Sequence, residues 1–150
     1  EMPTTRYQIE REILIEAPVE VVWRTVTEPS QITQWFAPEV ALAAEPGARG
    51  HIRFSDDEGG PVLVETVEPP TRFSFWWNHP TGAELEPGNA VLVEFTLASE
   101  GAGHTRLRVT ESGLEPLAWS DAEKQHYADG HNEGWADFIG RLAQLLAPQA

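Results

Sequence analysis

Residues 120–147 read SDAEKQHYADGHNEGWADFIGRLAQLLA. The first four residues have the S-x-x-E form of a capping box, in which the side chains of Ser120 and Glu123 satisfy backbone N–H groups at a helix start. Apolar residues then recur in steps of three, four and seven, at Trp135, Phe138, Ile139, Leu142, Leu145 and Leu146. This spacing predicts one long amphipathic helix over about residues 121–147.

The apolar stripe of this predicted helix changes character along its length. Its C-terminal half is aliphatic, whereas towards the N-terminus it continues through His131, Ala128 and Tyr127. Residues four apart share one face of a helix, so Tyr127, His131 and Trp135 lie on the same side. A stripe that passes from aliphatic to mixed polar and aromatic residues predicts a solid core that opens into a lined pocket.

The rest of the chain supplies a surface for this stripe. Residues 6–16 alternate with period two and predict a strand, and two short helices follow, one from Val19 to about Thr27 and one that carries Ile32, Trp35 and Phe36. A weak strand over residues 39–44 precedes alternating segments, separated by Gly and Pro turns, between about 48 and 112. Phe73, Phe75, Trp77 and His79 share one face of one such segment, and a polar loop over residues 80–88 follows it. We expect an α+β fold: a curved antiparallel sheet of six to seven strands around the C-terminal helix.

Composition limits the classes of function. The 150 residues predict a single domain, and the net charge of −14, with Lys124 as the only lysine, argues against nucleic acid and membrane surfaces as partners. No apolar run reaches the length of a membrane span, and we expect a cytoplasmic protein. There is no cysteine, and no pair of the five histidines has ligand spacing, so we expect neither a metal site nor a cofactor. The acidic run 56–58 is interpreted as a solvated turn.

Several stretches carry a resemblance to a known family. They are residues 15–23 (IEAPVEVVW), Trp35-Phe36, residues 46–54, residues 67–75 (VEPPTRFSF), residues 104–113 (HTRLRVTESG) and residues 134–146. In this order they resemble the helix-grip superfamily of START and Bet v 1-like domains, and within it the bacterial branch related to the activator of Hsp90 ATPase. The resemblance implies a helix-grip fold, but this fold hosts ligand carriers, cyclases and co-chaperones, so it does not select one function.

Strand parity and the helix stripe together predict the walls of a cavity between helix and sheet. The candidate ligand-binding residues are Trp35, Phe36, Phe54, Phe75, Trp77, Phe95, Tyr127, His131 and Trp135. The alternative is that these aromatic side chains simply fill the core. His131 is either a hydrogen-bonding handle or acid/base, or a histidine satisfied by a backbone carbonyl or water. Gly130 and Gly134 flank it, which indicates a close approach to the helix backbone or a bend.

Three functions are compatible with these observations. The favoured one is a binding module whose cavity holds a small hydrophobic or aromatic molecule without chemistry. The second is a cyclase or aromatase-type enzyme that uses His131 or Tyr127 as acid/base in the same cavity. The third is an interaction protein that stimulates an Hsp90-like chaperone. Trp76 is predicted on the outer face of the sheet, which leaves open a homodimer through that face or packing beneath the 80–88 loop.

Overall fold

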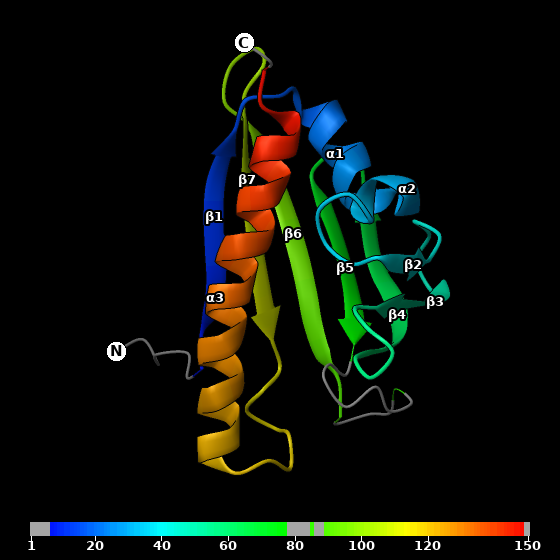
Figure 1. The fold of residues 1–150 in the computed structure, drawn as a ribbon, viewed down its shortest axis with the longest axis vertical. Coiled ribbons are helices and arrows are strands. Elements are labelled where there is room, and N and C mark those ends of the chain that lie inside the picture. The colour runs from blue at the N-terminus through cyan, green and yellow to red at the C-terminus, as the bar shows by residue number, and fades with distance from the viewer. Residues whose placement is uncertain (1–6, 78–84, 86–88, 149–150) are drawn as a thin grey trace.

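The computed structural model describes residues 7–77, 85 and 89–148, and its framework is one seven-stranded antiparallel sheet in the order β1-β7-β6-β5-β4-β3-β2 (Figure 1). The strands are β1 (Ile9–Ile15), β2 (Glu39–Ala41), β3 (Arg49–Arg53), β4 (Gly59–Glu68), β5 (Arg72–Trp77), β6 (Val91–Ser99) and β7 (Thr105–Ser112). The helices are α1 (Val19–Thr27), α2 (Pro29–Ile32) and α3 (Asp121–Leu146). The predicted helix-grip architecture is confirmed.

The long helix α3 begins and ends where its sequence signals predicted. The Ser120 hydroxyl accepts a hydrogen bond from the Glu123 backbone N–H, and the Glu123 carboxylate accepts one from the Ser120 N–H, both at 3.1 Å. The helix α3 packs along β1, while α1 contacts β6 and α2 contacts β2, farther across the sheet (Figure 1). The sheet face is therefore covered by two separate helical layers. None of the described helices combines the length and apolar character that a membrane crossing requires.

The core follows the predicted strand alternation. Val91, Val93, Phe95 and Leu97 of β6 are buried, and the residues between them are half-buried. The same parity buries Leu107 and Val109 of β7 beneath α3. Hydrophobic side chains thus gather on the face that the helices cover, as period two requires of a sheet that is wet on its other side.

The second short helix differs from its prediction. It ends at Ile32, after which the backbone N–H groups of Trp35 and Phe36 both donate to the Ile32 carbonyl in a tight turn. This turn buries both aromatic rings, and the Trp35 indole donates to the Thr25 carbonyl at 2.9 Å. The predicted strand over residues 39–44 is also shorter and ends at Ala41. Asn78, His79 and most of the predicted 80–88 loop lie outside the described residues.

The outer face of the sheet carries paired charges. Arg106 binds Glu100 and Glu12, and Arg108 binds Glu12, with their closest N–O distances at 2.6 and 3.0 Å. The Trp76 indole donates to the Glu65 carboxylate at 3.0 Å, so Trp76 lies on this face as predicted. Its use as a homodimer surface stays a prediction.

Candidate functional site

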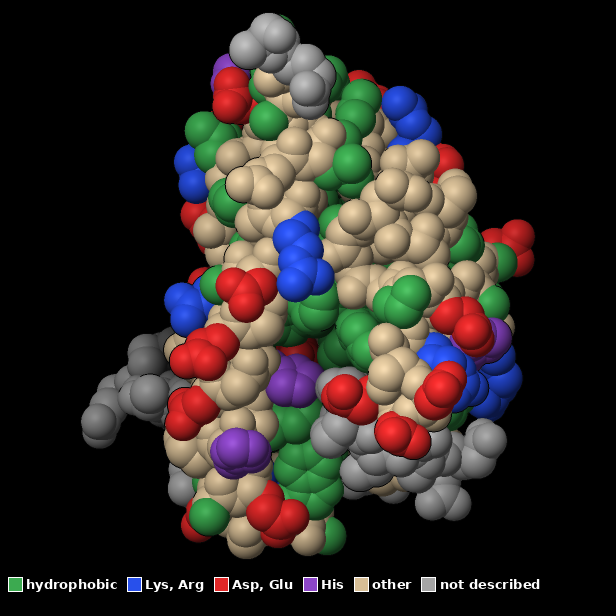
Figure 2. Space-filling view, in the orientation of Figure 1, with side chains coloured by type: hydrophobic (Ala, Val, Ile, Leu, Met, Phe, Trp, Pro, Cys, Tyr) green, Lys and Arg blue, Asp and Glu red, His purple; other side chains and the backbone are tan. Residues whose placement is uncertain are grey.

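A cavity of about 280 Å³ lies between α3 and the α2–β3 side of the fold. It is lined by Phe36, Phe54, Glu58, Trp77, Gly130, His131, Gly134, Trp135 and Phe138. Figure 2 shows hydrophobic side chains exposed in a hollow beside α3, whereas acidic side chains line the outer surface of that helix. The cavity therefore forms where the two helical layers separate.

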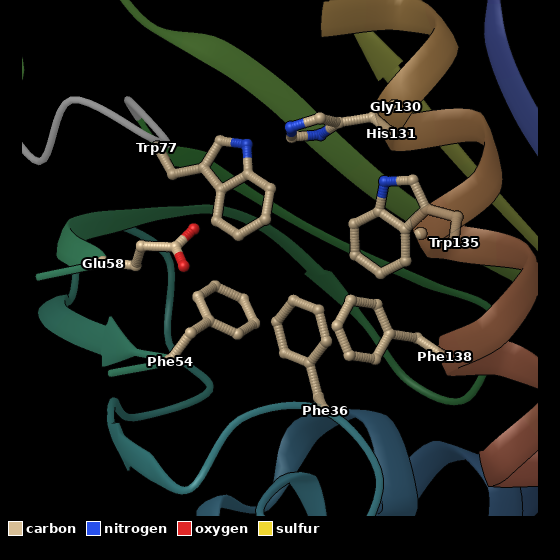
Figure 3. A pocket seen from close by; sticks show the side chains of 9 residues that line it. Phe36, Phe54, Glu58, Trp77, Gly130, His131, Trp135 and Phe138 are labelled. Atoms are coloured by element: carbon tan, nitrogen blue, oxygen red, sulfur yellow. The ribbon is translucent and has the colours of Figure 1, made fainter. Parts of the chain in front are cut away.

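Aromatic rings from four segments meet at this cavity (Figure 3). Phe36 lies at their centre: its ring is nearly parallel to that of Trp135, with centroids 5.2 Å apart at 12°. Phe138 and Phe54 present their edges to Phe36 at centroid distances of 4.9 and 5.1 Å. Trp77 lies 6.0 Å from Phe36 at 25°. Rings held in such offset and edge-to-face contacts form ordered apolar walls.

A buried carboxylate, Glu111, lies behind one wall of the cavity. Glu111 follows Leu107 and Val109 on the inward face of β7, and its side chain is fully enclosed. It accepts four hydrogen bonds: from Trp77 Nε1 at 3.2 Å, Tyr127 Oη at 2.6 Å, His131 Nδ1 at 2.5 Å and Trp135 Nε1 at 2.6 Å. Three of these donors are the helix residues at spacing four, so the polar face predicted for α3 is turned towards this one group.

The hydrogen bonds decide the charge of this cluster. Burial alone would raise the pKa of Glu111, but the hydrogen bond from His131 and the electrostatic interaction with it, with the hydrogen bonds of Tyr127 and Trp135, bring this pKa below its ordinary value. Burial, and then the negative charge of Glu111, raise the pKa of Tyr127 well above its ordinary value. Glu111 is therefore ionised at neutral pH and Tyr127 keeps its proton. Because an ionised carboxylate can only accept, His131 Nδ1 must carry the hydrogen that it shares with Glu111.

The structure places the predicted site residues in two groups. Phe36, Phe54, Trp77, His131 and Trp135 line the cavity. The other candidates are buried but do not line the cavity, as expected of residues that fill the core: Trp35, Phe75, Phe95 and Tyr127. Tyr127 still belongs to the polar cluster through Glu111.

The sequence analysis missed further members of the site. Phe138 was assigned only to the helix stripe, and Glu58 to a solvated turn, yet both line the cavity. Glu111 was not singled out, although its odd number continues the inward parity of Leu107 and Val109. A charged residue at an inward strand position is a signal of a buried polar site, because an unpaired charge there would be costly.

Two further carboxylates among the described residues do not line this cavity. Glu65 and Glu94, which a one-residue change in strand parity would turn inward, lie away from the cavity lining and interact with Trp76 and Arg72. Among the described residues, no group of three His, Asp or Glu side chains has the arrangement of a metal site. The described lining is thus apolar apart from two polar side chains, His131 on α3 and Glu58 at a different part of the wall (Figure 3).

Solved structures of similar fold come from several bacteria. A protein of Mesorhizobium loti, MLL2253, is 29% identical with a TM-score of 0.77, over 93% of this chain and 96% of that one. DynU16, a putative protein in the dynemicin biosynthetic locus, is 30% identical with a TM-score of 0.74, over 95% of this chain and 48% of that one. The Aha1 dimer from Colwellia psychrerythraea is 21% identical with a TM-score of 0.74, over 93% and 95% of the two chains, and shows the shared fold.

No curated protein matches the sequence. The family model described as activator of Hsp90 ATPase homolog 1-like protein matches residues 16–147, which include every helix and all strands except β1. The resemblance read from the short motifs is therefore confirmed across nearly the whole chain, and the protein belongs to the family of activator of Hsp90 ATPase homolog 1-like proteins.

Proposed function

We propose that this protein binds a small aromatic molecule in the cavity between α3 and the α2–β3 side of the fold. The observation that carries the proposal is the lining itself: five aromatic rings surround about 280 Å³, with His131 and Glu58 as polar groups. Apolar walls supply affinity through burial, and a few polar groups orient the ligand. The similarity to DynU16, from a biosynthetic locus, supports a role with small molecules.

The size of the cavity limits the ligand. Pockets for drug-sized ligands span roughly 300–1,000 Å³, so about 280 Å³ corresponds to a compact molecule of one or two rings. The rings of Phe36, Trp77 and Trp135 lie within 30° of one another. Such near-parallel faces favour stacking with a flat ligand over contact with a branched aliphatic one.

Two helix glycines support the same proposal. A Cβ at Gly130 or Gly134 would meet no described heavy atom within 4 Å, and both residues line the cavity. No described protein group therefore makes the close backbone approach that their presence indicated. Glycine costs about 1 kcal/mol relative to alanine inside a helix. A ligand that occupies the space beside the helix accounts for the presence of glycine at these two positions despite this cost.

The test uses a pair of matched substitutions in α3. Binding of 4-nitroanisole and 2-methoxynaphthalene is measured by calorimetry and by quenching of Trp77 and Trp135. Gly134→Leu places a side chain in the cavity, whereas Gly140→Leu places the same side chain on the same helix outside the cavity lining. We expect saturable binding that Gly134→Leu weakens at least about tenfold and Gly140→Leu leaves unchanged. The proposal is wrong if neither compound binds, or if both substitutions weaken binding equally.

Stimulation of an Hsp90-like ATPase is a second candidate, because the matched family model is named for that activity. The net charge of −14 and the single lysine offer little basic surface for such a partner. Adding the purified protein to an Hsp90 ATPase assay tests this candidate directly. An unchanged rate at saturating protein would remove it.

A further inference from the structure

The two tryptophans of the cavity turn the same edge of their rings towards one carboxylate. Trp77 Nε1 and Trp135 Nε1 donate hydrogen bonds to Glu111 at 3.2 and 2.6 Å. In Figure 3 both indole nitrogens lie on the side of the cavity where His131 lies. An aromatic ring is positive at its edge and negative at its faces, and the N–H group is the most positive part of an indole edge. Because Glu111 takes up both N–H groups, a ligand meets the carbon surface of the two rings.

The near-parallel rings of Phe36, Trp77 and Trp135 extend this surface. Their centroids lie 5.2, 6.0 and 6.1 Å apart, and their planes lie within 30° of one another. A cation over the face of a ring, within about 6 Å of its centroid, is attracted by the ring, and tryptophan attracts it most strongly. The lining already has one such contact, since Arg141 Cζ lies 5.3 Å from the centroid of the Phe138 ring. Arg141 itself is exposed and lies outside the described lining.

The charges around the cavity have the sign that a cationic ligand requires. Among the described residues that line it, none is a lysine or an arginine, and Glu58 contributes a carboxylate. Glu111, which is ionised and fully enclosed, lies behind the wall. His131 shares its Nδ1 hydrogen with Glu111, so the two side chains together are negative or neutral, whichever protonation state the imidazole has. The described lining therefore presents no net positive charge to a ligand.

We propose that the aromatic ligand of this cavity is a cation whose charge is delocalised over its ring, such as an N-alkylated nitrogen heterocycle. The inference rests on the proposed function, since the same cavity must hold the ligand. A delocalised cation suits the site better than an ammonium group, because a compact ammonium is strongly hydrated and loses that hydration in an apolar cavity. A flat cation keeps the stacking contact with Phe36, Trp77 and Trp135, and its charge is attracted to their faces.

The experiment compares two molecules of the same shape: 1-methylquinolinium, a cation, and 1-methylnaphthalene, its neutral isostere. Calorimetry measures both affinities for the wild-type protein in about 0.15 M salt, where the Debye length is about 8 Å and attraction by distant surface charges is screened. We expect the cation to bind about tenfold more tightly, which is within the range of a partly desolvated cation–π contact. This comparison uses the unaltered protein, so it does not depend on the folding of a variant.

Matched substitutions locate the effect in the cavity. Phe54→Leu removes a half-buried ring from the lining and should lower the preference for the cation by about threefold, the effect of one partly exposed cation–π contact. Trp23→Leu removes a half-buried ring outside the described lining and is the control, which should leave the preference unchanged. Gly134→Leu, which places a side chain in the cavity, should weaken binding of both compounds at least about tenfold.

The outcomes separate the two proposals. If 1-methylnaphthalene binds as tightly as 1-methylquinolinium or more tightly, the cation proposal is wrong and binding of an aromatic molecule stands. The cation proposal also fails if Gly134→Leu leaves binding of the cation unchanged, because the cation then binds elsewhere on this acidic protein. Equal effects of Phe54→Leu and Trp23→Leu on the preference would overturn it as well. If neither compound binds, both proposals fail.

Discussion

Tyr127 and His131 lie one helical turn apart on α3, and their rings stack with centroids 3.7 Å apart. Tyr127 Oη and His131 Nδ1 donate hydrogen bonds to different oxygens of Glu111. Spacing four on the helix places both side chains over the same inward position of β7. The long helix is thus joined to the sheet by a buried polar cluster as well as by apolar packing. This cluster also forms one wall of the cavity, so stability and binding depend on the same groups.

Replacement of Glu111 by glutamine is expected to lower the free energy of unfolding by about 3–5 kcal/mol. The amide retains one acceptor oxygen but turns an NH₂ group towards buried donors that need acceptors, so the hydrogen bonds to one of the two Glu111 oxygens are lost. Urea unfolding measures the change. Glu65→Gln is the matched control, because Glu65 also accepts from a tryptophan indole but is exposed, and a change below about 1 kcal/mol is expected there. Equal effects at both positions would contradict the prediction.

Stability is expected to fall in acid, partly through Glu111. Its pKa in the folded protein lies below the ordinary value of 4.5, because the hydrogen bonds outweigh burial. A lowered pKa contributes stability that is present above pH 4.5 and is lost as the pH falls through the native value. The unfolding free energy of wild type should therefore decrease below about pH 4.5 more steeply than that of Glu111→Gln. Parallel curves for the two proteins would show that Glu111 does not contribute.

Tyr127 should resist ionisation in the folded protein. Burial, and then the charge of Glu111, raise the pKa of Tyr127 well above 10.0. A raised pKa contributes stability that is present below pH 10 and lost as the pH rises through the native value. In Tyr7→Phe, which leaves Tyr127 as the one tyrosine, tyrosinate absorbance should appear only together with alkaline unfolding. Tyrosinate absorbance that rises near pH 10 while the fold is intact would refute this.

Alanine substitution of two glycines should have opposite effects on stability, because a Cβ has space at one position and meets other atoms at the other. Gly134→Ala is expected to raise the free energy of unfolding by about 0.5–1 kcal/mol, since its Cβ meets no described atom and alanine favours the helix. Gly50→Ala is expected to lower it, because a Cβ at Gly50 would overlap the Ala41 carbonyl oxygen. Thermal unfolding of both variants measures whether each substitution raises or lowers the stability of the protein. A stabilising Gly50→Ala would show that β2 can move away from β3.

The overall fold follows from local patterns in the chain. The steps of three, four and seven over 120–147, with Ser120 and Glu123 at the start, determine a helix whose observed bounds are Asp121–Leu146. Period-two alternation determines which strand residues face inward, as in β6. These signals are reliable because backbone geometry repeats regularly, so a single buried face must appear as a regular spacing in sequence.

The composition of the site was decided by tertiary contacts. Glu111 comes from β7, while its donors come from β5 and α3, and no local spacing states that four donors converge on one carboxylate. The same holds for Trp35 and Phe36, which are adjacent in sequence, yet only Phe36 lines the cavity. Parity shows that a side chain points inward, but whether it meets solid core or open space depends on how far the separate helical layers approach each other across the sheet.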